Sequence, residues 1–420
     1  MDVASLLPIL PSPPPPPTPS PHSPSLSLEE MEAELEDAPA CGVSEIPVFA
    51  VGMETFLHAP GKSPNKGAAS LLKEIAGVYL VLGDQTRYRS YALGAIALSD
   101  AREKVETKED ALRLSGVGQS LATKIAVFVK TGKCALLDSI YATPKWAALS
   151  TLIGIWGVGP TTARKWYHKG ISSLDELRAS DILLSDRQAL GIKFYDDFQI
   201  RMPREEVEAH IQIIADVIHQ VQSAGGEEDD SLDLLVVPAG SYRRGKASSH
   251  DADIIITTAS DAVPPHALAG LIDSLIDALY EADYIQATLS VRRKLSKAHL
   301  PEVVADLESE LFDIFFGIVR LPPPYSLALP GGPDPVRRLD ILVVPRECFP
   351  VAFLFFTGSA MFNRILRIHA KKLGYKLNND KIFPIDDNDL PLGPPVVVQS
   401  EADVFDLLGL PWIPPGWRNS

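Results

Sequence analysis

The pattern of apolar and polar positions divides the chain into two regions. Up to about residue 225, apolar residues recur at i, i+3 and i+4 in LLKEIAGVYLVLG, YRSYALGAIALSDAREKV, SLATKIAVFVKTG and EEVEAHIQIIADVIHQVQ, a spacing that predicts amphipathic helices. Later runs such as LDLLVVPAG, DADIIITT, FFGIVRL and RRLDILVVP are short, β-branched and bounded by Pro or Gly, with a helical HALAGLIDSLIDALYEA among them. We therefore predict an α+β protein, with a helical first half and a sheet in the second.

Changes in texture also predict where the domains begin and end. AFLFFTGSAMFNRILRIHAKKLG predicts helix and is followed by a Pro-rich end with short strands, whereas GGEEDD at 225–230 is a polar hinge. The predicted regions are a tail at 1–60, helical regions at 61–140 and 141–230, a sheet region at 231–345 and a small C-terminal α+β region at 346–420.

The acidic charge of the chain is concentrated at its beginning. The net charge is −15, and residues 1–60 supply −9 of it with nine acids and no Lys or Arg. Residues 61–135 carry twelve Lys and Arg against seven acids, a local balance of +5. Because phosphate binding depends on local patches, the total charge does not exclude a nucleic-acid partner. The Pro/Ser-rich and acidic start cannot bury a core, so we expect a disordered tail that is either simply solvated or binds a partner.

Cysteine content and hydropathy indicate the kind of cellular compartment in which the protein is expected. Cys41, Cys134 and Cys348 are far apart and odd in number, which argues against a disulfide framework or a Cys-based zinc site and favours a reducing compartment. No run approaches the roughly 18 apolar residues that span a bilayer, and the N-terminus lacks the basic region and cleavage site of a signal peptide. We expect a soluble, non-secreted protein.

Three carboxylates head two of the predicted strands. Asp251 and Asp253 stand at i and i+2, so on a strand they share one face, and Asp340 heads RRLDILVVP in the same manner. If the two strands pair, the three carboxylates converge and suit Mg²⁺, and two such ions support phosphoryl transfer. Taken alone, a D-x-D pair is also typical of ordinary strand-end acids.

A candidate phosphate site lies just upstream. Gly240 and Ser241 form a turn that opens a helix, which offers free backbone N–H groups and the positive end of a helix dipole. Arg244 can add a charge-assisted bond to the same phosphate oxygens. The alternative is a capped helix with ordinary surface arginines.

Two turns in the helical region share an apolar-x-Gly-apolar-Gly pattern. They contain Gly116 and Gly118 in the first copy and Gly157 and Gly159 in the second, forty-one residues further on. Glycine lets the backbone approach a phosphate, and its N–H then binds without reading sequence, as in helix-hairpin-helix motifs. Two copies flanked by Lys and Arg predict contacts with the DNA backbone.

GSYRRGKASSHDADIIIT, RRLDILVVP and FFTGSAMFNR together resemble the family X DNA polymerases, and the likeness runs from about residue 65 to the end, LLGLPW included. It implies a helical lyase-type domain with helix-hairpin-helix motifs, a polymerase beta-like nucleotidyltransferase palm with a mixed sheet, and a small subdomain that binds the nascent base pair. Asp251, Asp253 and Asp340 would bind two Mg²⁺ ions, with Mn²⁺ as the alternative, and Asp340 would take the proton of the primer 3′-hydroxyl.

The resemblance also assigns the nucleotide site. Gly240, Ser241, Arg244 and, in MPREEV, Arg204 would bind the incoming triphosphate. The segment FFTGSAMFNR would supply the sugar and base end, although phenylalanines there are equally explained by core packing. Its expected contacts are the sugar for Phe355, Phe356 and Gly358, the minor-groove edge of the base for Asn363, and the template strand for Arg367.

The resemblance assigns two further sites to the helical half. Lys124 would form the Schiff base of a 5′-deoxyribose phosphate lyase, helped by burial or by Arg87, Arg89 and Arg113, although a solvated helix lysine is the alternative. Ser120 stands where such lyases often have another lysine, which puts the activity in doubt. Monovalent cations would bind carbonyls around Leu112, Leu114, Val117, Ile153, Ile155 and Val158.

Four departures from the family bear on function. His250 precedes Asp251 where some members have Gly, whereas terminal transferase has His; by position it belongs to the nucleotide site. Phe355 replaces a Tyr of the sugar gate. The segment 286–315 is long, as in template-independent members, and nothing in 1–60 could form a BRCT domain.

These observations predict a monomeric, nuclear, template-directed DNA polymerase that fills short gaps during base-excision repair or end joining. Its partners would be gapped or nicked DNA, dNTPs and repair proteins that bind the N-terminal tail. The rival hypotheses are a template-independent, terminal-transferase-like enzyme and, from another class, an inactive DNA-binding scaffold.

Overall fold

The computed structural model describes residues 63–224, 232–295, 310–326 and 334–418. The predicted tail, Cys41, the hinge at 225–230 and the middle of the long segment 286–315 lie outside the described residues. The helices that open the described chain are α3 (Lys66–Leu82), α4 (Gln85–Asp100), α5 (Lys108–Leu112), α6 (Gln119–Thr131), α7 (Ala135–Tyr141), α8 (Pro144–Ile153), α9 (Pro160–His168), α10 (Leu174–Arg178), α11 (Asp186–Lys193) and α12 (Tyr195–Gln199).

The helical region forms because each helix buries one apolar stripe. In α3, the side chains of Leu72, Ile75 and Tyr79 are buried, and Gly83 ends the helix with a left-handed backbone, φ +86°. The helices α6 and α9 both begin directly after a Gly-containing turn, with Gly118 and Gly159 as their N-caps. The helical half predicted from periodicity is therefore confirmed.

A two-stranded ribbon joins the helical region to the sheet region. Strand β1 (Met202–Pro203) pairs antiparallel with β3 (Ser248–Ser249), and α13 (Arg204–Ala224) follows β1 at once. The sequence did not predict this ribbon, because two residues are too few to show a strand period. It brings the start of α13 beside the segment that leads into the first two carboxylates.

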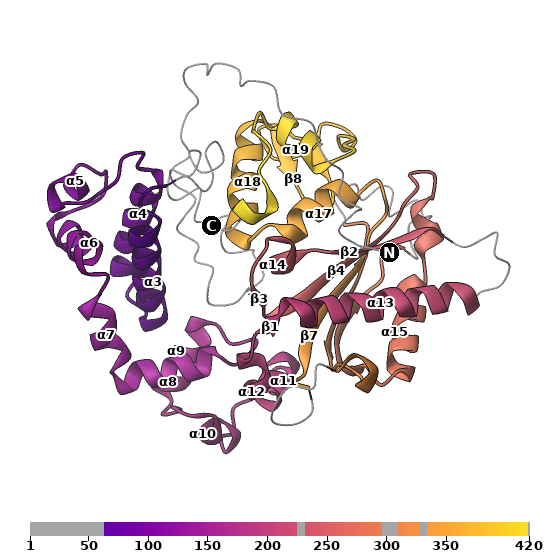
Figure 1. Cartoon of the computed structure of the whole chain (residues 1–420), viewed down its shortest axis with the longest axis horizontal. Coiled ribbons are helices and arrows are strands. Elements are labelled where there is room, and N and C mark those ends of the chain that lie inside the picture. Colours follow the sequence, from indigo (N-terminus) through magenta and orange to yellow (C-terminus); the bar gives the residue numbers. More distant parts are fainter. Residues whose placement is uncertain (1–62, 225–231, 296–309, 327–333, 419–420) are drawn as a thin grey trace. The chain divides into compact units, whose positions relative to one another are not determined.

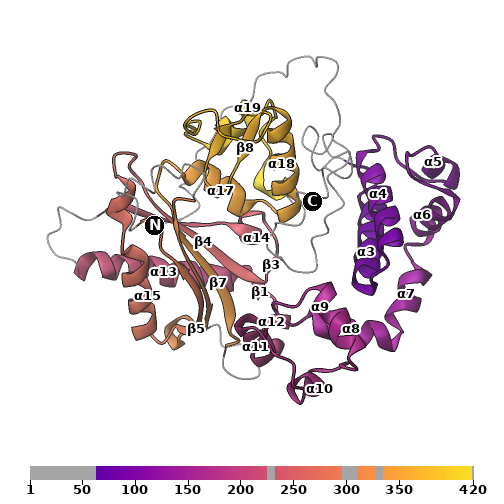
Figure 2. The same ribbon diagram turned by 180° about the vertical axis from the view of Figure 1, so that it is seen from behind.

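A five-stranded mixed sheet forms the centre of the second half (Figures 1 and 2). Its strands run in the order β2-β4-β7-β6-β5, with β4 and β7 parallel and the other neighbours antiparallel. The strands are β2 (Leu234–Pro238), β4 (Asp251–Thr258), β5 (Ile285–Arg292), β6 (Asp313–Val319) and β7 (Arg337–Val343). This sheet confirms the predicted α+β class with a mixed sheet.

The two faces of the sheet pack against different helices. One face packs on α13 and α15 (Leu271–Glu281) through a core that includes Ile254 and Ile341 (Figure 1). The opposite face packs on α17 (Phe349–Thr357) through a smaller core with Ile255 and Leu342. Side chains alternate between the two faces along a strand. A residue two positions from Ile255 or Leu342 therefore points to the face that packs on α17.

The C-terminal part breaks its predicted helix at a Gly-Ser step. Gly358 is extended, with φ −64° and ψ 149°, and Ser359 caps the next helix by accepting a bond from the N–H of Phe362, 3.1 Å. The elements here are α17, α18 (Ala360–Lys372), β8 (Tyr375–Leu377), β9 (Ile382–Pro384) and α19 (Glu401–Leu407). The short α19 was not predicted, and a capping box between Ser400 and Asp403 starts it.

Short elements complete the described part: α14 (Gly240–Arg243) and the 3₁₀ helices η4 (Pro265–Leu268), η6 (Pro323–Tyr325) and η7 (Pro415–Trp417). Within the described ranges, no helix combines the length and the apolar run that a membrane crossing requires.

Candidate active site

The predicted carboxylates gather on one face of the sheet at the start of its two parallel strands. Asp253 of β4 and Asp340 of β7 are direct register partners, and Asp251 precedes Asp253 by two positions. Alternation places all three on the side of Ile255 and Leu342, which is the face that packs on α17. The pairing of the two carboxylate-bearing strands, which the sequence analysis took as a condition, is therefore present.

Burial and mutual repulsion disfavour the charged forms of this cluster. Desolvation raises the pKa of Asp253 well above its usual value, and the charges of Asp251 and Asp340 raise it further. Desolvation first and the charge of Asp251 second raise the pKa of Asp340 to about 7. A nearby positive charge would favour the ionised forms of Asp253 and Asp340.

Arg338 supplies part of that positive charge. Its Nη2 donates to Oδ2 of Asp251 at 2.7 Å, and its charge opposes the rise of the pKa of Asp253 and Asp340. Arg338 was not among the site residues predicted from the sequence. The signal was available, because Arg338 stands two positions before Asp340 and therefore shares its face of the strand.

The donor set of the cluster fits a hard divalent cation. Carboxylate oxygens are the ligands that Mg²⁺ prefers, and a cation beside the three acids would oppose the burial and repulsion that raise the pKa of Asp253 and Asp340. In the ranges that the structure describes, no group of three or more His, Cys, Asp or Glu side chains is arranged so that it could hold a metal ion. One oxygen of Asp251 is paired with Arg338.

The predicted phosphate turn lies directly beside Asp253. Helix α14 begins at Gly240, whose φ of +54° is one that other residues rarely adopt. The N–H of Ala239 donates to the carbonyl of Asp253 at 2.9 Å, and the hydroxyl of Ser241 bonds that of Ser249 at 2.8 Å. The turn is therefore bonded at its start to the carboxylate strand β4 and at Ser241 to the short strand β3 that precedes β4.

The arginines of this region donate to backbone carbonyls. Arg204 Nη1 donates to the carbonyls of Tyr242 and Lys246 at 2.8 and 3.1 Å, and its guanidinium lies 3.8 Å from the ring centroid of Tyr242. Arg244 Nη1 donates to the carbonyl of Thr357 at 2.9 Å. Both predicted triphosphate ligands thus lie at the turn, with part of their donor capacity used by the protein itself.

Arg243, which the sequence analysis did not single out, anchors the turn to the C-terminal part. It binds Glu401 through both Nη atoms at 2.7 Å and also donates to the hydroxyl of Thr357 at 2.7 Å. Arg418, which is fully buried, completes the cluster by donating to Glu401 at 2.6 Å. Nothing local predicts this contact, because Arg243 and Glu401 are 158 positions apart.

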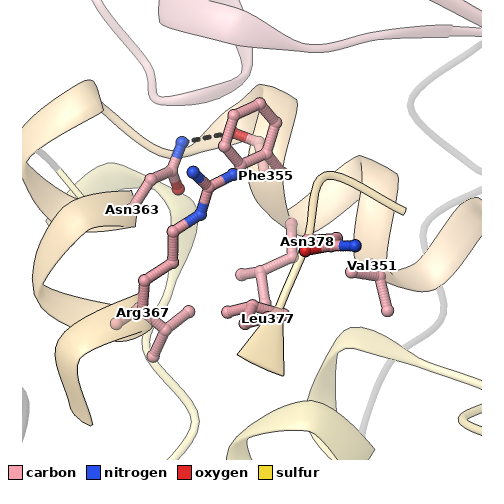
Figure 3. Close-up of a pocket in the computed structure, with 8 residues that line it drawn as sticks. Val351, Phe355, Asn363, Arg367, Leu377 and Asn378 are labelled. Carbon is pink, nitrogen blue, oxygen red and sulfur yellow. Dashed lines mark hydrogen bonds between the residues drawn. The ribbon is translucent and has the colours of Figure 1, made fainter. Parts of the chain in front are cut away.

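The nucleotide-site residues after β7 surround the break between α17 and α18 (Figure 3). Asn363 donates from Nδ2 to the carbonyl of Phe355 at 2.7 Å, and the guanidinium of Arg367 lies 4.7 Å from the ring centroid of Phe355 (Figure 3). A small pocket at this point is lined by Val351, Leu354, Phe355, Asn363, Leu366, Arg367, Leu377 and Asn378. The predicted base contacts, Asn363 and Arg367, therefore lie at one pocket with Phe355.

Phe356 and Gly358 have packing roles at the same break. Phe356 meets Phe312 edge-on with ring centroids 5.9 Å apart, so it also contributes to the core, as the alternative interpretation held. A Cβ at Gly358 would lie 2.2 Å from Oδ1 of Asn363, so the close approach of Asn363 requires glycine there.

His250 lies at the surface immediately before β4. Partial desolvation, followed by the charges of Arg201 and Arg338, lowers its pKa below the usual value. The free protein therefore disfavours the charged imidazolium at this position.

The two Gly-containing turns of the helical half have matching backbones. Gly116 and Gly157 adopt φ of +78° and +84°, and Gly118 and Gly159 cap the helices that follow. In each turn the N–H of the intervening Val bonds a carbonyl three residues earlier, that of Leu114 or Ile155. An added Cβ at Gly116, Gly118 or Gly159 would meet nothing within 4 Å, so these positions are open to a ligand, whereas one at Gly157 would lie 2.9 Å from the side chain of Arg187.

Lys124 lies on α6, half-buried, one turn after the first Gly-containing turn. Its Nζ donates to the hydroxyl of Ser120 at 2.8 Å. The arginines expected to assist it have partners of their own: Arg87 pairs with Asp84 and Arg113 with Asp110. The serine noted as a departure is thus the residue that holds the lysine.

A mixed sheet with clustered carboxylates, a Gly-Ser turn against one of them and glycine turns in the preceding helices are the arrangement expected of a polymerase-type nucleotidyltransferase. Family models match four stretches of the chain. They describe a helix-hairpin-helix domain at residues 63–134, the fingers domain of DNA polymerase lambda at 150–199, the DNA polymerase beta palm at 201–346 and the DNA polymerase beta thumb at 352–419.

Two named relatives agree with these models. DNA polymerase lambda of Rattus norvegicus is 33% identical over 353 residues, which cover 83% of this chain and 55% of the rat protein. DNA polymerase lambda of Arabidopsis thaliana is 29% identical over 387 residues, which cover 91% of this chain and 67% of the plant protein. The chain therefore spans about half the length of the rat relative. The chain is therefore similar to the family X DNA polymerases and, within that family, to polymerase lambda. This confirms the resemblance on which the sequence analysis relied, and the family uses divalent metal ions in catalysis.

Proposed function

We propose that this chain is a template-directed DNA polymerase that fills short gaps in DNA repair. The observation that carries the proposal is the register of Asp253 against Asp340 beside the turn at Gly240, because it gathers carboxylates and phosphate donors at one point. The substrates would be a dNTP and gapped or nicked DNA held by the two Gly-containing turns. The repair pathway would be base-excision repair or end joining, and the protein would act as a monomer in the nucleus.

In the proposed reaction, the primer 3′-oxygen attacks the α-phosphate of the nucleotide. The bond between O3′ and the α-phosphorus forms, the bond to the bridging oxygen breaks, and pyrophosphate leaves with its electron pair. Asp251, Asp253 and Asp340 would hold two Mg²⁺ or Mn²⁺ ions, whose contribution is to activate the attacking oxygen and neutralise charge on the leaving oxygens. The carboxylate of Asp340 would take the proton of the 3′-hydroxyl.

The remaining residues would position the substrates. The backbone N–H groups of the Gly240–Ser241 turn would donate hydrogen bonds to the phosphate. Arg204 and Arg244 would add positive charge at the same turn. Phe355 would lie against the sugar, and Asn363 and Arg367 would contact the base pair once the bond from Asn363 to the Phe355 carbonyl opens. Carbonyls at the Gly-containing turns, such as those of Leu112 and Ile153, would bind monovalent cations.

Lys124 supports a second activity, 5′-deoxyribose phosphate lyase. A Schiff base forms when an uncharged lysine amine attacks the sugar aldehyde and water leaves, and the adjacent Ser120 hydroxyl can accept a hydrogen bond from the ammonium beforehand. The lyase function would be weaker than in relatives that carry a second lysine at the position of Ser120.

The first test is primer extension on a one-nucleotide gap with a 5′-phosphate, offering each of the four dNTPs separately with Mg²⁺. Addition of the complementary nucleotide alone is expected. Addition of all four, or equal extension of blunt and single-stranded primers, would favour the template-independent alternative, for which His250 beside Asp251 is the observation. The variant Asp251→Ala is expected to lose incorporation and keep gapped-DNA binding, whereas an unmodified protein that binds DNA without incorporation would be a scaffold.

A further inference from the structure

The indole of Trp156 lies within reach of two guanidinium groups. Trp156 belongs to the second Gly-containing turn, and the guanidinium carbons of Arg187 and Arg338 lie 5.2 and 5.7 Å from its ring centroid. Both distances fall within the range of cation–π attraction. The ring of Phe198 meets the indole edge-on, with centroids 6.0 Å apart.

One of the two arginines also contacts the carboxylate cluster. Arg338 donates to Asp251 at 2.7 Å while it lies over Trp156. An unbroken chain of contacts therefore runs from the backbone turn, through the indole and the guanidinium, to a carboxylate of the proposed catalytic centre. Arg187, the other guanidinium near the indole, acts on the cluster through its charge, which opposes the raised pKa of Asp340.

The turn that carries Trp156 is itself held firmly by α11. A Cβ at Gly191 would lie 2.5 Å from the carbonyl oxygen of Trp156, so helix and turn are in direct backbone contact. Gln188 donates from Nε2 to the carbonyl of Gly157 at 3.2 Å. The side chain of Arg187 packs on Gly157 from the same helix. The indole therefore offers a fixed surface, whereas an arginine on its long stem has many rotamers to choose from.

We propose that Trp156 is a positioning residue for nucleotidyl transfer. By stacking on Arg338 it keeps the guanidinium on Asp251, so that the turn proposed to bind the DNA backbone also sets the orientation of a catalytic carboxylate. This inference rests on the proposed polymerase function. It assigns Trp156 a role beyond filling the space behind the turn, and that role acts through Arg338.

The test compares Trp156→Leu with Trp156→Phe in single-turnover incorporation at saturating gapped DNA and dNTP. Loss of the stacking surface is expected to lower the rate about tenfold in Trp156→Leu, and Trp156→Phe is expected to recover most of it because a smaller ring still attracts the guanidinium. The Kd for gapped DNA, measured by anisotropy in EDTA, should change by less than about twofold. The control is Trp146→Leu, since Trp146 is a nearby indole that stacks on Tyr141; it should keep the parent rate.

A double-mutant cycle separates positioning from simple packing. In the Arg338→Met background, Trp156→Leu should cause no further loss of rate, and thermal unfolding of the metal-free variants should show the same non-additivity. Additive losses, or a Trp156→Leu variant that loses DNA affinity at an unchanged saturated rate, would overturn the proposal. A parent protein that binds gapped DNA and adds no nucleotide would refute the proposed function instead, and the positioning role with it.

Discussion

Gly240 and Asp253 are so close that no side chain fits between them. A Cβ at position 240 would lie 1.7 Å from Oδ2 and 2.5 Å from Cγ of Asp253. The backbone at Gly240 is also left-handed, with φ +54°. The phosphate turn and the buried carboxylate therefore form one unit, and neither can be altered without moving the other.

Gly240→Ala is therefore expected to abolish incorporation and to destabilise the protein. The new methyl group must displace the Asp253 carboxylate or the turn, and overpacking together with backbone strain costs about 2–5 kcal/mol of unfolding free energy. Gly245→Ala is the matched control, because Gly245 has a similar φ of +74° and nothing within 4 Å of an added Cβ. It should lose about 1 kcal/mol and keep most of the activity. Urea unfolding and gap-filling rates are measured for both variants. A much larger loss in Gly240→Ala than in Gly245→Ala indicates the collision with Asp253, and similar losses indicate backbone strain alone.

The acidic cluster predicts that Mg²⁺ binding is pH-dependent. Burial and the charge of Asp251 raise the pKa of Asp340 to about 7, so the metal-free folded protein holds a proton that the unfolded chain releases near pH 4. Folding stability of the metal-free protein should therefore fall as the pH rises from about 4 to 7, since the folded state binds more protons over this interval. Over the same interval Mg²⁺ affinity should rise, because the ion replaces that proton.

Thermal melts with and without Mg²⁺ between pH 5.5 and 8 measure this difference. The stabilisation by Mg²⁺ should grow with pH in the parent protein and grow much less in Asp340→Asn, which has no proton to release at that position. If the stabilisation by Mg²⁺ stays constant across this pH range in both the parent protein and the variant, Asp340 does not titrate there.

The cluster of Arg243, Glu401 and Arg418 should stabilise the junction between the sheet and the C-terminal part. Arg418 is fully buried and Glu401 is 9% exposed, so removal of the carboxylate leaves two guanidinium groups without their partner. Glu401→Ala is expected to cost about 3–5 kcal/mol of unfolding free energy. Asp175→Ala, which breaks the exposed pair with Arg178 at 2.9 Å, should cost less than about 1 kcal/mol. If both variants lose the same unfolding free energy in chemical denaturation, the buried cluster stabilises the protein no more than an exposed ion pair does.

Lys124 predicts a covalent intermediate that can be trapped. With DNA carrying a 5′-deoxyribose phosphate, borohydride should reduce a Schiff base and leave a cross-linked protein in the parent and none in Lys124→Ala. Lys130→Ala, on the same helix α6, controls for loss of charge. Ser120→Lys should raise the yield, because a neighbouring ammonium lowers the pKa of the amine. A cross-link that persists in Lys124→Ala would place the nucleophile elsewhere.

The sequence by itself determined the features that depend on local periodicity. Asp251 and Asp253 share a face because a strand repeats every two residues, and the same rule would have identified Arg338 from Asp340. The helices of the first half follow from their apolar stripes, and the Gly-containing turns follow from a backbone that only glycine adopts at low cost. The roles of these residues came from the resemblance to the family, because the pattern of apolar and polar positions does not indicate them.

Only the tertiary structure decided which of these elements meet. The placement of β7 parallel to β4, with Asp340 opposite Asp253, depends on contacts between residues 87 positions apart, and no local pattern fixes the register. The same holds for Arg243 on Glu401 and for Arg338 between Trp156 and Asp251. Side-chain charges and lengths allow many such partners, and the choice among them is made when distant elements pack into a common core.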